Sequence, residues 1–400
     1  MQASITANSK RIESIDILRG IVMVLMALDH VRDYFHLTAD SDDPLNLVTT
    51  TPFLFFTRWI THFCAPVFVF LSGTSIYLQS LRKTKKELSV FLIKRGLWLI
   101  FVEVIIISLA WTFNPLYNNI PLQVIWAIGI SMVILGLLIK QSFNLIFAIG
   151  LAIVCTHNLL DFQENSKDFS AGFFMDLIHS ARFTAYNFLP NHRVIIVYPF
   201  LPWTGLMMLG YCCGKFFTAK YSSQKRMQIL NSIGIGLILF FVVIRYLNVY
   251  GDPYPWAVQQ SSLYTFFAFI KVHKYPPSLM YVCITIGPAL LLLSFLEKIK
   301  NGFTNSIQIY GRVAFFYYVL HIYLIHLIAA IFFFAKGHSF HEGMGIGEQF
   351  SFYFTAANDG YGLGIVYLVW IVVVASLFPL CKWYNHYKSN HKEKWWLSYL

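Results

Sequence analysis

The first apolar stretch of the chain places a fixed cation and a titratable imidazole on one predicted helix face. Arg19 lies near the start of a helix predicted over 15–36, and His30 lies near its end. Their separation of eleven residues corresponds to roughly three helical turns, or about 16 Å along the axis, with both side chains on nearly the same face. Ionisable side chains inside an apolar membrane helix are costly and by default indicate function. We therefore interpret His30 as a general base.

Two carboxylates accompany His30 on this helix. Asp29 and Asp33 lie four residues apart, and His30 and Asp33 lie three apart, so these side chains can meet on the helix surface. A carboxylate beside an imidazole fixes its tautomer and raises its basicity, so we expect both to assist catalysis. His36, just beyond, is a rival for the role of base. A charge cluster that reaches the lipid headgroups is the alternative explanation, and it fits Arg32.

The second apolar stretch adds another imidazole. A helix predicted over 58–80 runs antiparallel to the first and carries His62 at a depth similar to that of His30, so the two histidines are expected to share one pocket. Pro66 lacks a backbone N–H and should free carbonyls near His62. A histidine that only packs remains the alternative for His62.

A third polar helix is predicted over 306–335, with Arg312 near its start and His321 in its middle. A histidine at that depth needs a hydrogen-bond partner or a cavity, and we favour a cavity wall. Arg312 and Arg19 fall on the same predicted side of the membrane, where cations suit a phosphate-rich ligand. Lipid anchoring explains most of the basic loop on that side, which holds Arg82, Lys86 and Arg95.

The composition predicts an all-α integral membrane protein embedded in a lipid bilayer. Hydrophobic residues make up 57% of 400 positions and charged residues 12%, against about 25% charged in soluble domains. The net charge of +11 does not indicate a nucleic-acid partner, because the basic residues lie between apolar stretches. About ten transmembrane helices are predicted, over 15–36, 58–80, 90–112, 121–139, 143–160, 195–218, 228–247, 277–297, 306–335 and 361–383.

The distribution of basic residues predicts the orientation. Of the 30 Lys and Arg residues, 19 fall in one set of alternating connections, which should therefore be cytoplasmic. Both termini are expected inside, with a cytoplasmic segment over 1–14 and a basic tail over 384–400. The whole chain, 1–400, is expected to form a single membrane domain. The six cysteines lack metal-ligand spacing, and we expect no bound metal.

Five ordered stretches of the chain resemble the heparan-α-glucosaminide N-acetyltransferase catalytic-domain family, whose bacterial members are related to a lysosomal enzyme. The stretches are RIESIDILRGIVMVLMALDHVRDYFH, RWITHFCAPVFVFLSGTSIYL, YPFLPWTGLMMLGY, KYPPSLMYVCITIGPAL and IYGRVAFFYYVLHIYLIH. The spacing of Arg19 and His30, followed by FVFLSG, also resembles the broader membrane acyltransferases that modify sugars and cell-envelope glycans.

The resemblance implies acyl transfer across a bacterial inner membrane, from cytoplasmic acetyl-CoA or another acyl-CoA to a sugar or glycan acceptor at the outer face. A histidine would act as general base or carry the acyl group transiently. In the lysosomal enzyme this histidine follows the first span, so His30, His36 and His62 remain rivals. The residues expected to hold acyl-CoA are Arg19, Arg312, His321, Arg82, Lys86 and Arg95.

A proton-coupled transporter or a flippase for a small or lipid-linked molecule is the alternative function. Histidines in a helical bundle would suit proton coupling, although ion-coupled transporters usually need carboxylates inside the membrane. Apart from the aspartates of the first helix, Glu103 is the exception in the predicted spans. The sequence leaves open the acceptor, the acyl chain and the oligomeric state, a homodimer included.

Overall fold

The computed structural model describes residues 12–39, 41–166, 169–180, 183–344, 352–355 and 360–398. The elements are α1 (Glu13–Phe35), α2 (Pro52–Thr61), α3 (Cys64–Ser80), α4 (Lys85–Val102), the π-helix η1 (Glu103–Ile107), α5 (Ser108–Thr112), β1 (Asn119–Leu122), α6 (Val124–Leu138), α7 (Phe143–Thr156), α8 (Leu159–Glu164), α9 (Phe173–Ile178), β2 (Ala185–Leu189), β3 (His192–Ile196), α10 (Phe200–Cys213), the 3-10 helix η2 (Gly214–Phe217), α11 (Ser223–Leu247), α12 (Ser262–Ile270), α13 (Leu279–Leu296), α14 (Gly302–Arg312), α15 (Ala314–Ala335), α16 (Phe340–Gly343), α17 (Leu363–Asn390) and the 3-10 helix η3 (Trp395–Ser398).

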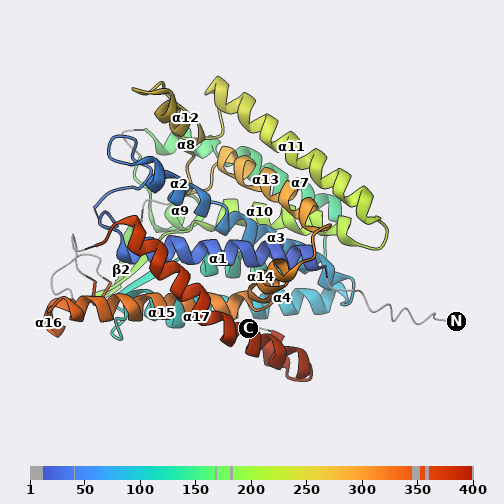
Figure 1. Ribbon diagram of the computed structural model, residues 1–400. Helices are drawn as coiled ribbons and strands as arrows, with labels where there is room; N and C mark the ends of the chain where they lie inside the picture. Colours follow the sequence, from blue (N-terminus) through green and yellow to red (C-terminus); the bar gives the residue numbers. More distant parts are fainter. Residues whose placement is uncertain are drawn as a thin grey trace.

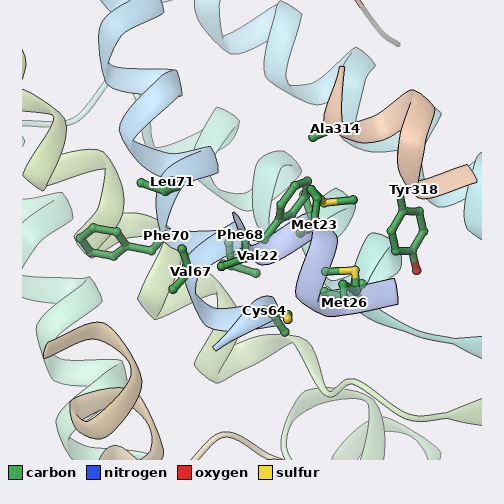
Figure 2. Close-up of a cluster of buried hydrophobic side chains, with 14 of the residues drawn as sticks. Val22, Met23, Met26, Cys64, Val67, Phe68, Phe70, Leu71, Ala314 and Tyr318 are labelled. Carbon is green, nitrogen blue, oxygen red and sulfur yellow. The ribbon is translucent and has the colours of Figure 1, made fainter. Parts of the chain in front are cut away.

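Helix α1 runs through the middle of a helical bundle and packs against α3, α13, α14, α15 and α17 (Figure 1). The end of the bundle where α1 begins is called the Glu13 end, and the opposite end is called the Phe35 end. Figure 2 shows the contact: Met23 and Met26 of α1 lie between Phe68 of α3 and Tyr318 of α15. Because these helices surround α1, most of its side chains, including those of Asp16, Asp29, His30 and Arg32, are buried.

The structure supports an all-α membrane protein. Six helices of the described residues are long and apolar enough to cross a membrane: Pro52–Ser80, Phe143–Glu164, Ser223–Leu247, Leu279–Leu296, Ala314–Ala335 and Leu363–Asn390. Helix α1 carries too many charges to meet that criterion, and α6 is shorter. The count of ten spans and the location of the termini remain predictions, and Lys10, Arg11, Lys167 and Arg182, used to predict orientation, lie outside the described residues.

Two predicted helices are interrupted. The expected single helix over 306–335 is wrong, because α14 ends at Arg312 and Val313 has non-helical angles of φ −121° and ψ 35° before α15 begins. The break follows Gly311, whose backbone packs on α1. The expected helix over 58–80 begins earlier, at Pro52, and divides into α2 and α3 around His62.

A small sheet at the Phe35 end was not predicted. Its strand order is β1-β3-β2, with β1 parallel and β2 antiparallel to β3. Four-residue and five-residue strands give little periodic signal in a chain rich in apolar residues. The sheet ties the segment before α6 to the segment before α10.

Glycines allow α1 and α14 to approach closely. A Cβ on Gly311 would overlap the Asp16 carbonyl oxygen, and a Cβ on Gly20 would overlap the Ile307 carbonyl oxygen. Small residues are typical of helix contacts in membranes, because they let backbones approach. This contact sets the distance between Arg19 of α1 and Arg312 of α14.

The substitution Gly311→Leu should separate α1 from α14 and lower the free energy of unfolding by about 1–3 kcal/mol or more, as overpacking does. Thermal unfolding of the protein in detergent measures the loss. Gly302→Leu, in the same helix, is the matched control, because a Cβ there meets nothing within 4 Å. Equal stability of the two variants would contradict the close contact.

Candidate active site

His30 of α1 and His321 of α15 form a hydrogen-bonded pair. His30 Nδ1 and His321 Nε2 are 2.8 Å apart, and His321 Nδ1 lies 3.0 Å from the Tyr317 carbonyl oxygen. A carbonyl only accepts, so Nδ1 of His321 carries a hydrogen. In the neutral pair, Nε2 of His321 accepts and Nδ1 of His30 donates. The lone pair of His30 is therefore on Nε2, which is the state that a general base requires.

Aromatic side chains surround this pair. The Trp111 ring lies edge-on to His30 with ring centroids 4.8 Å apart, and the Tyr318 ring lies 6.3 Å away. His321 is fully buried, whereas His30 retains 9% exposure. The indole N–H of Trp111 faces the Tyr318 hydroxyl oxygen, and no acceptor among the described residues meets the O–H groups of Tyr317 and Tyr318. Buried donors of this kind normally have partners, so they are available to a bound group.

Helices α1 and α5 are connected beside the pair. The Tyr34 hydroxyl donates to the Trp111 carbonyl oxygen at 2.6 Å. His30 lies one helical turn before Tyr34 on α1, so this hydrogen bond holds the indole of Trp111 next to His30. Trp111 and Tyr318 were not predicted as site residues, because aromatic residues are frequent throughout this chain and carry no distinctive spacing.

Asp29 is the centre of a buried charge cluster. Its carboxylate accepts from Arg58 Nη1 at 2.6 and 2.5 Å and from Arg32 Nη2 at 3.2 Å, and Lys274 Nζ lies 4.0 Å away. Arg32 also contacts Asp33 at 2.5 Å. The carboxylates of α1 thus pair with arginines, and the partner that orients His30 is His321. The role of Asp29 and Asp33 in catalysis stays a prediction, and in this structure Asp29 faces three cations and Asp33 faces Arg32.

His62 lies at the junction of α2 and α3. Because Pro66 has no N–H to donate to the His62 carbonyl oxygen, that oxygen accepts instead from the Tyr281 hydroxyl at 2.7 Å. The prediction that Pro66 frees a carbonyl at His62 is confirmed. Nδ1 of His62 is buried without a hydrogen-bond partner among the described residues.

A cavity of about 670 Å³ opens at the Phe35 end, and His62 and Arg58 form part of its wall. Burial lowers the pKa of His273, another wall residue, below its ordinary value. Burial by itself would raise the pKa of Tyr275, but Lys274 and Arg58 outweigh it and hold that pKa below its ordinary value. Basic residues outnumber acidic ones in the wall, with Arg58, Arg245, Lys271 and Lys274 against Asp43 and Asp252. Tyr254, Trp256 and Tyr275 supply its aromatic surface.

A second charge cluster lies at the Glu13 end. Arg19 Nη2 donates to Ser75 Oγ of α3 at 2.8 Å, and its Nη1 lies 3.3 Å from Asp16 Oδ1. Arg312 Nε lies 3.8 Å from Asp16 Oδ2. The structure therefore brings Arg19 and Arg312 together around one carboxylate, about three turns of α1 away from His30.

The remaining predicted site residues are Arg82, Lys86, Arg95 and His36. Arg82 on the turn after α3 and Lys86 in the first turn of α4 are exposed, and Arg95 of α4 lies over the Phe91 ring at 6.0 Å. His36, just after α1, contacts the Thr38 hydroxyl at 3.0 Å. The described structure gives His36 no contact with His30 or His62.

These features define a multi-pass membrane protein with a histidine site inside its helical bundle and a cationic cluster at one end. The chain belongs to the family described as heparan-alpha-glucosaminide N-acetyltransferase, catalytic, which matches residues 11–250. The resemblance inferred from the sequence is thus confirmed, and membership implies a transmembrane acetyltransferase-type enzyme. Among curated proteins, none matches the chain significantly. The matched range contains His30 and His62, whereas His321 lies beyond it.

The charge cluster at Asp29 can be tested by a double-mutant cycle of Asp29→Asn and Arg58→Met. We expect a coupling energy of about 1–3 kcal/mol, because removing one member leaves a buried charge uncompensated. Unfolding in detergent measures it. The exposed pair Glu13–Lys300, with side chains 35% and 64% exposed, is the control and should couple by about 0.5 kcal/mol or less. Equal coupling in both cycles would show that burial contributes nothing at Asp29.

Proposed function

We propose that the protein transfers an acetyl or other acyl group from cytoplasmic acyl-CoA to a sugar or glycan acceptor on the outer side of the membrane, with His30 as the general base. The Glu13 end is assigned to the cytoplasm, because the basic connections gather there. The observation that carries the proposal is the His30–His321–Tyr317 chain, which leaves the lone pair of His30 on Nε2.

In the proposed reaction, an acceptor hydroxyl or amine gives its proton to His30 Nε2 while its oxygen or nitrogen attacks the thioester carbonyl carbon. The carbon–sulfur bond then breaks, and the CoA thiolate takes the proton from the imidazolium. His321 accepts the Nδ1 hydrogen of His30 throughout and keeps the ring oriented. His321 is therefore assigned as a positioning residue, in place of a contact for acyl-CoA.

Trp111 and Tyr318 are proposed to stabilise the oxyanion. Both rings lie beside His30, and the Trp111 indole N–H and the Tyr318 hydroxyl face each other with no further partner in the described part of the chain. Donors in a site that excludes water stabilise developing negative charge more strongly than water does. An indole N–H and a neutral phenol are poor proton acceptors, which leaves proton removal from the acceptor to the imidazole.

The Glu13 end is proposed to hold the CoA phosphates. Arg312 has a side chain 31% exposed and lies next to Arg19 across Asp16. Guanidinium groups bind phosphate through charge-assisted hydrogen bonds. The distance of about 16 Å between Arg19 and His30 along α1 is one that the extended pantetheine arm of CoA can span, so the thioester would reach the histidine pair from this end.

The cavity at the Phe35 end is proposed as the acceptor site. Its aromatic surface suits the apolar face of a sugar ring, and Arg58 connects its wall to Asp29, the residue preceding His30. His62 is proposed to contact the acceptor there, which distinguishes its role from that of His30.

The substitution His30→Gln should lower acyl transfer by about 10²–10⁴-fold, because the proton acceptor is lost. His321→Phe should lower kcat with little change in KM, since it removes only the group that orients His30. Release of the CoA thiol from acetyl-CoA, with glucosamine as the acceptor probe, measures both in detergent. A transporter would release no thiol.

The exposed His386 supplies the control: His386→Gln should retain full activity. His62→Gln and His36→Gln test the other two candidates for the general base. Each should lose less acyl-transfer activity than His30→Gln. Full activity of His30→Gln, with its fold intact, would reject the assignment.

For acyl-CoA binding, Arg312→Ala should raise KM for acetyl-CoA by about tenfold or more, since a hydrogen bond to a charged group contributes about 1.5–3 kcal/mol. Arg19→Ala should also lower thermal stability, because Arg19 connects α1 to Ser75 of α3. The exposed Lys382 provides the control variant Lys382→Ala. An unchanged KM in Arg312→Ala would contradict a phosphate site at this end.

A further inference from the structure

A second buried polar cluster lies at the Phe35 end, outside the proposed active site. Asp161 and Glu164 of α8 face His179, which follows α9, and one ligand atom from each lies within 4.8 Å of the other two. Asp161 and Glu164 are each 8% exposed, and His179 is fully buried. Helices α8 and α9 lie on the same side of the bundle as α2 and α12 (Figure 1). Acyl transfer as proposed above uses none of these residues.

The chain builds this cluster from a helical face and a returning segment. His157, Asp161 and Glu164 are spaced four and three residues apart, which places them on one side of a helical segment. Asn158 holds the carboxylate of Asp161: its Nδ2 donates to Asp161 Oδ2 at 2.7 Å, while its Oδ1 accepts from Leu279 N at 2.9 Å. The orientation of Asp161 is therefore fixed by the start of α13.

The two histidines are connected through the cluster. Nδ1 of His179 lies 2.7 Å from Glu164 Oε1, and Nε2 of His179 lies 2.9 Å from His157 Nδ1. The Pro277 carbonyl oxygen lies within hydrogen-bonding reach of the buried His157 ring. Because that carbonyl only accepts, it favours a hydrogen on Nε2 of His157 and leaves Nδ1 to accept from His179 Nε2.

We propose that Asp161, Glu164 and His179 bind a divalent transition-metal ion such as Zn²⁺. One imidazole nitrogen with carboxylate oxygens suits zinc, whereas calcium and magnesium prefer oxygen alone. The ion binds Nδ1 of His179, and Nε2–H then donates to His157, which is the outer contact that metal-bound histidines usually make. Ligand atoms at about 2.1 Å from one ion lie about 3.0–3.4 Å apart, so the Glu164–His179 contact opens by only a few tenths of an ångström.

An ion reaches this cluster through a cavity of about 170 Å³, whose wall includes Asp161 and Asp252. Asp252 also lines the larger cavity and accepts from His273 N at 2.9 Å. The ion connects α8 to the residue that follows α9. It stabilises the edge of the smaller cavity, which Asp161 lines. It takes no part in the acyl-transfer chemistry, so its presence and the identity of the catalytic histidine are independent questions.

Full-length protein stripped with EDTA and titrated with Zn²⁺ alone tests the proposal, without acyl-CoA or acceptor. We expect one equivalent of zinc per chain by mass spectrometry of the desalted protein, and a rise in Tm. Glu164→Gln and His179→Gln should bind at least about tenfold more weakly, and His157→Gln about 10–100-fold more weakly. Asp161→Asn, which keeps the shape of the side chain, covers the case in which a histidine variant does not fold.

The exposed His386 serves as the control here also, and His386→Gln should bind zinc as the wild type does. If Asp161→Asn no longer binds one zinc ion per chain, while the Tm of the metal-free protein is unchanged, the site is supported. Failure of the stripped wild-type protein to bind a stoichiometric ion would overturn it. So would equal binding by the wild type and all the ligand variants, because the ion would then lie elsewhere.

Discussion

The buried carboxylate of Asp29 is the constraint on which the arrangement of this protein depends. A lone charge in a low-dielectric interior is too costly to persist, so it must be paired. Arg58 from α2 and Lys274 from the segment before α13 supply the compensation, together with Arg32 from the same helix. One side chain of α1 thereby holds α2 and the segment before α13 together, and Arg58 and Lys274 also line the large cavity.

Helix α1 also separates two kinds of polar site. At the Glu13 end, Asp16 lies between Arg19 and Arg312, and the close glycine contact with α14 sets their spacing. Three turns later, His30 meets His321. Because a continuous helix keeps a fixed rise per residue, the distance between the two sites is a property of the backbone. Side-chain rearrangement at either end of α1 does not change this separation of the two sites along the helix axis.

Much of the helical framework was predictable. The apolar stretches coincide with helices, and Pro66 frees the His62 carbonyl as expected, because a missing N–H is a local property. The break at Val313 was not predicted, because no proline marks it and Gly311 and Arg312 were taken as positions inside one continuous helix. The pairing of His30 with His321 was missed as well. Two helix faces can each be read from periodicity, but their relative rotation depends on the packing of every helix between them.

The sequence by itself determined that this is a helical membrane protein of the acetyltransferase family, and that Arg19 and His30 lie three turns apart on α1, because composition and helical spacing are local quantities. Only the tertiary structure decided that His321, 291 residues away, forms a hydrogen bond with His30, and that arginines pair with the neighbouring aspartates. Partners in a buried polar network are selected by three-dimensional proximity and by the cost of leaving a charge uncompensated. Neither is encoded in the spacing along one helix.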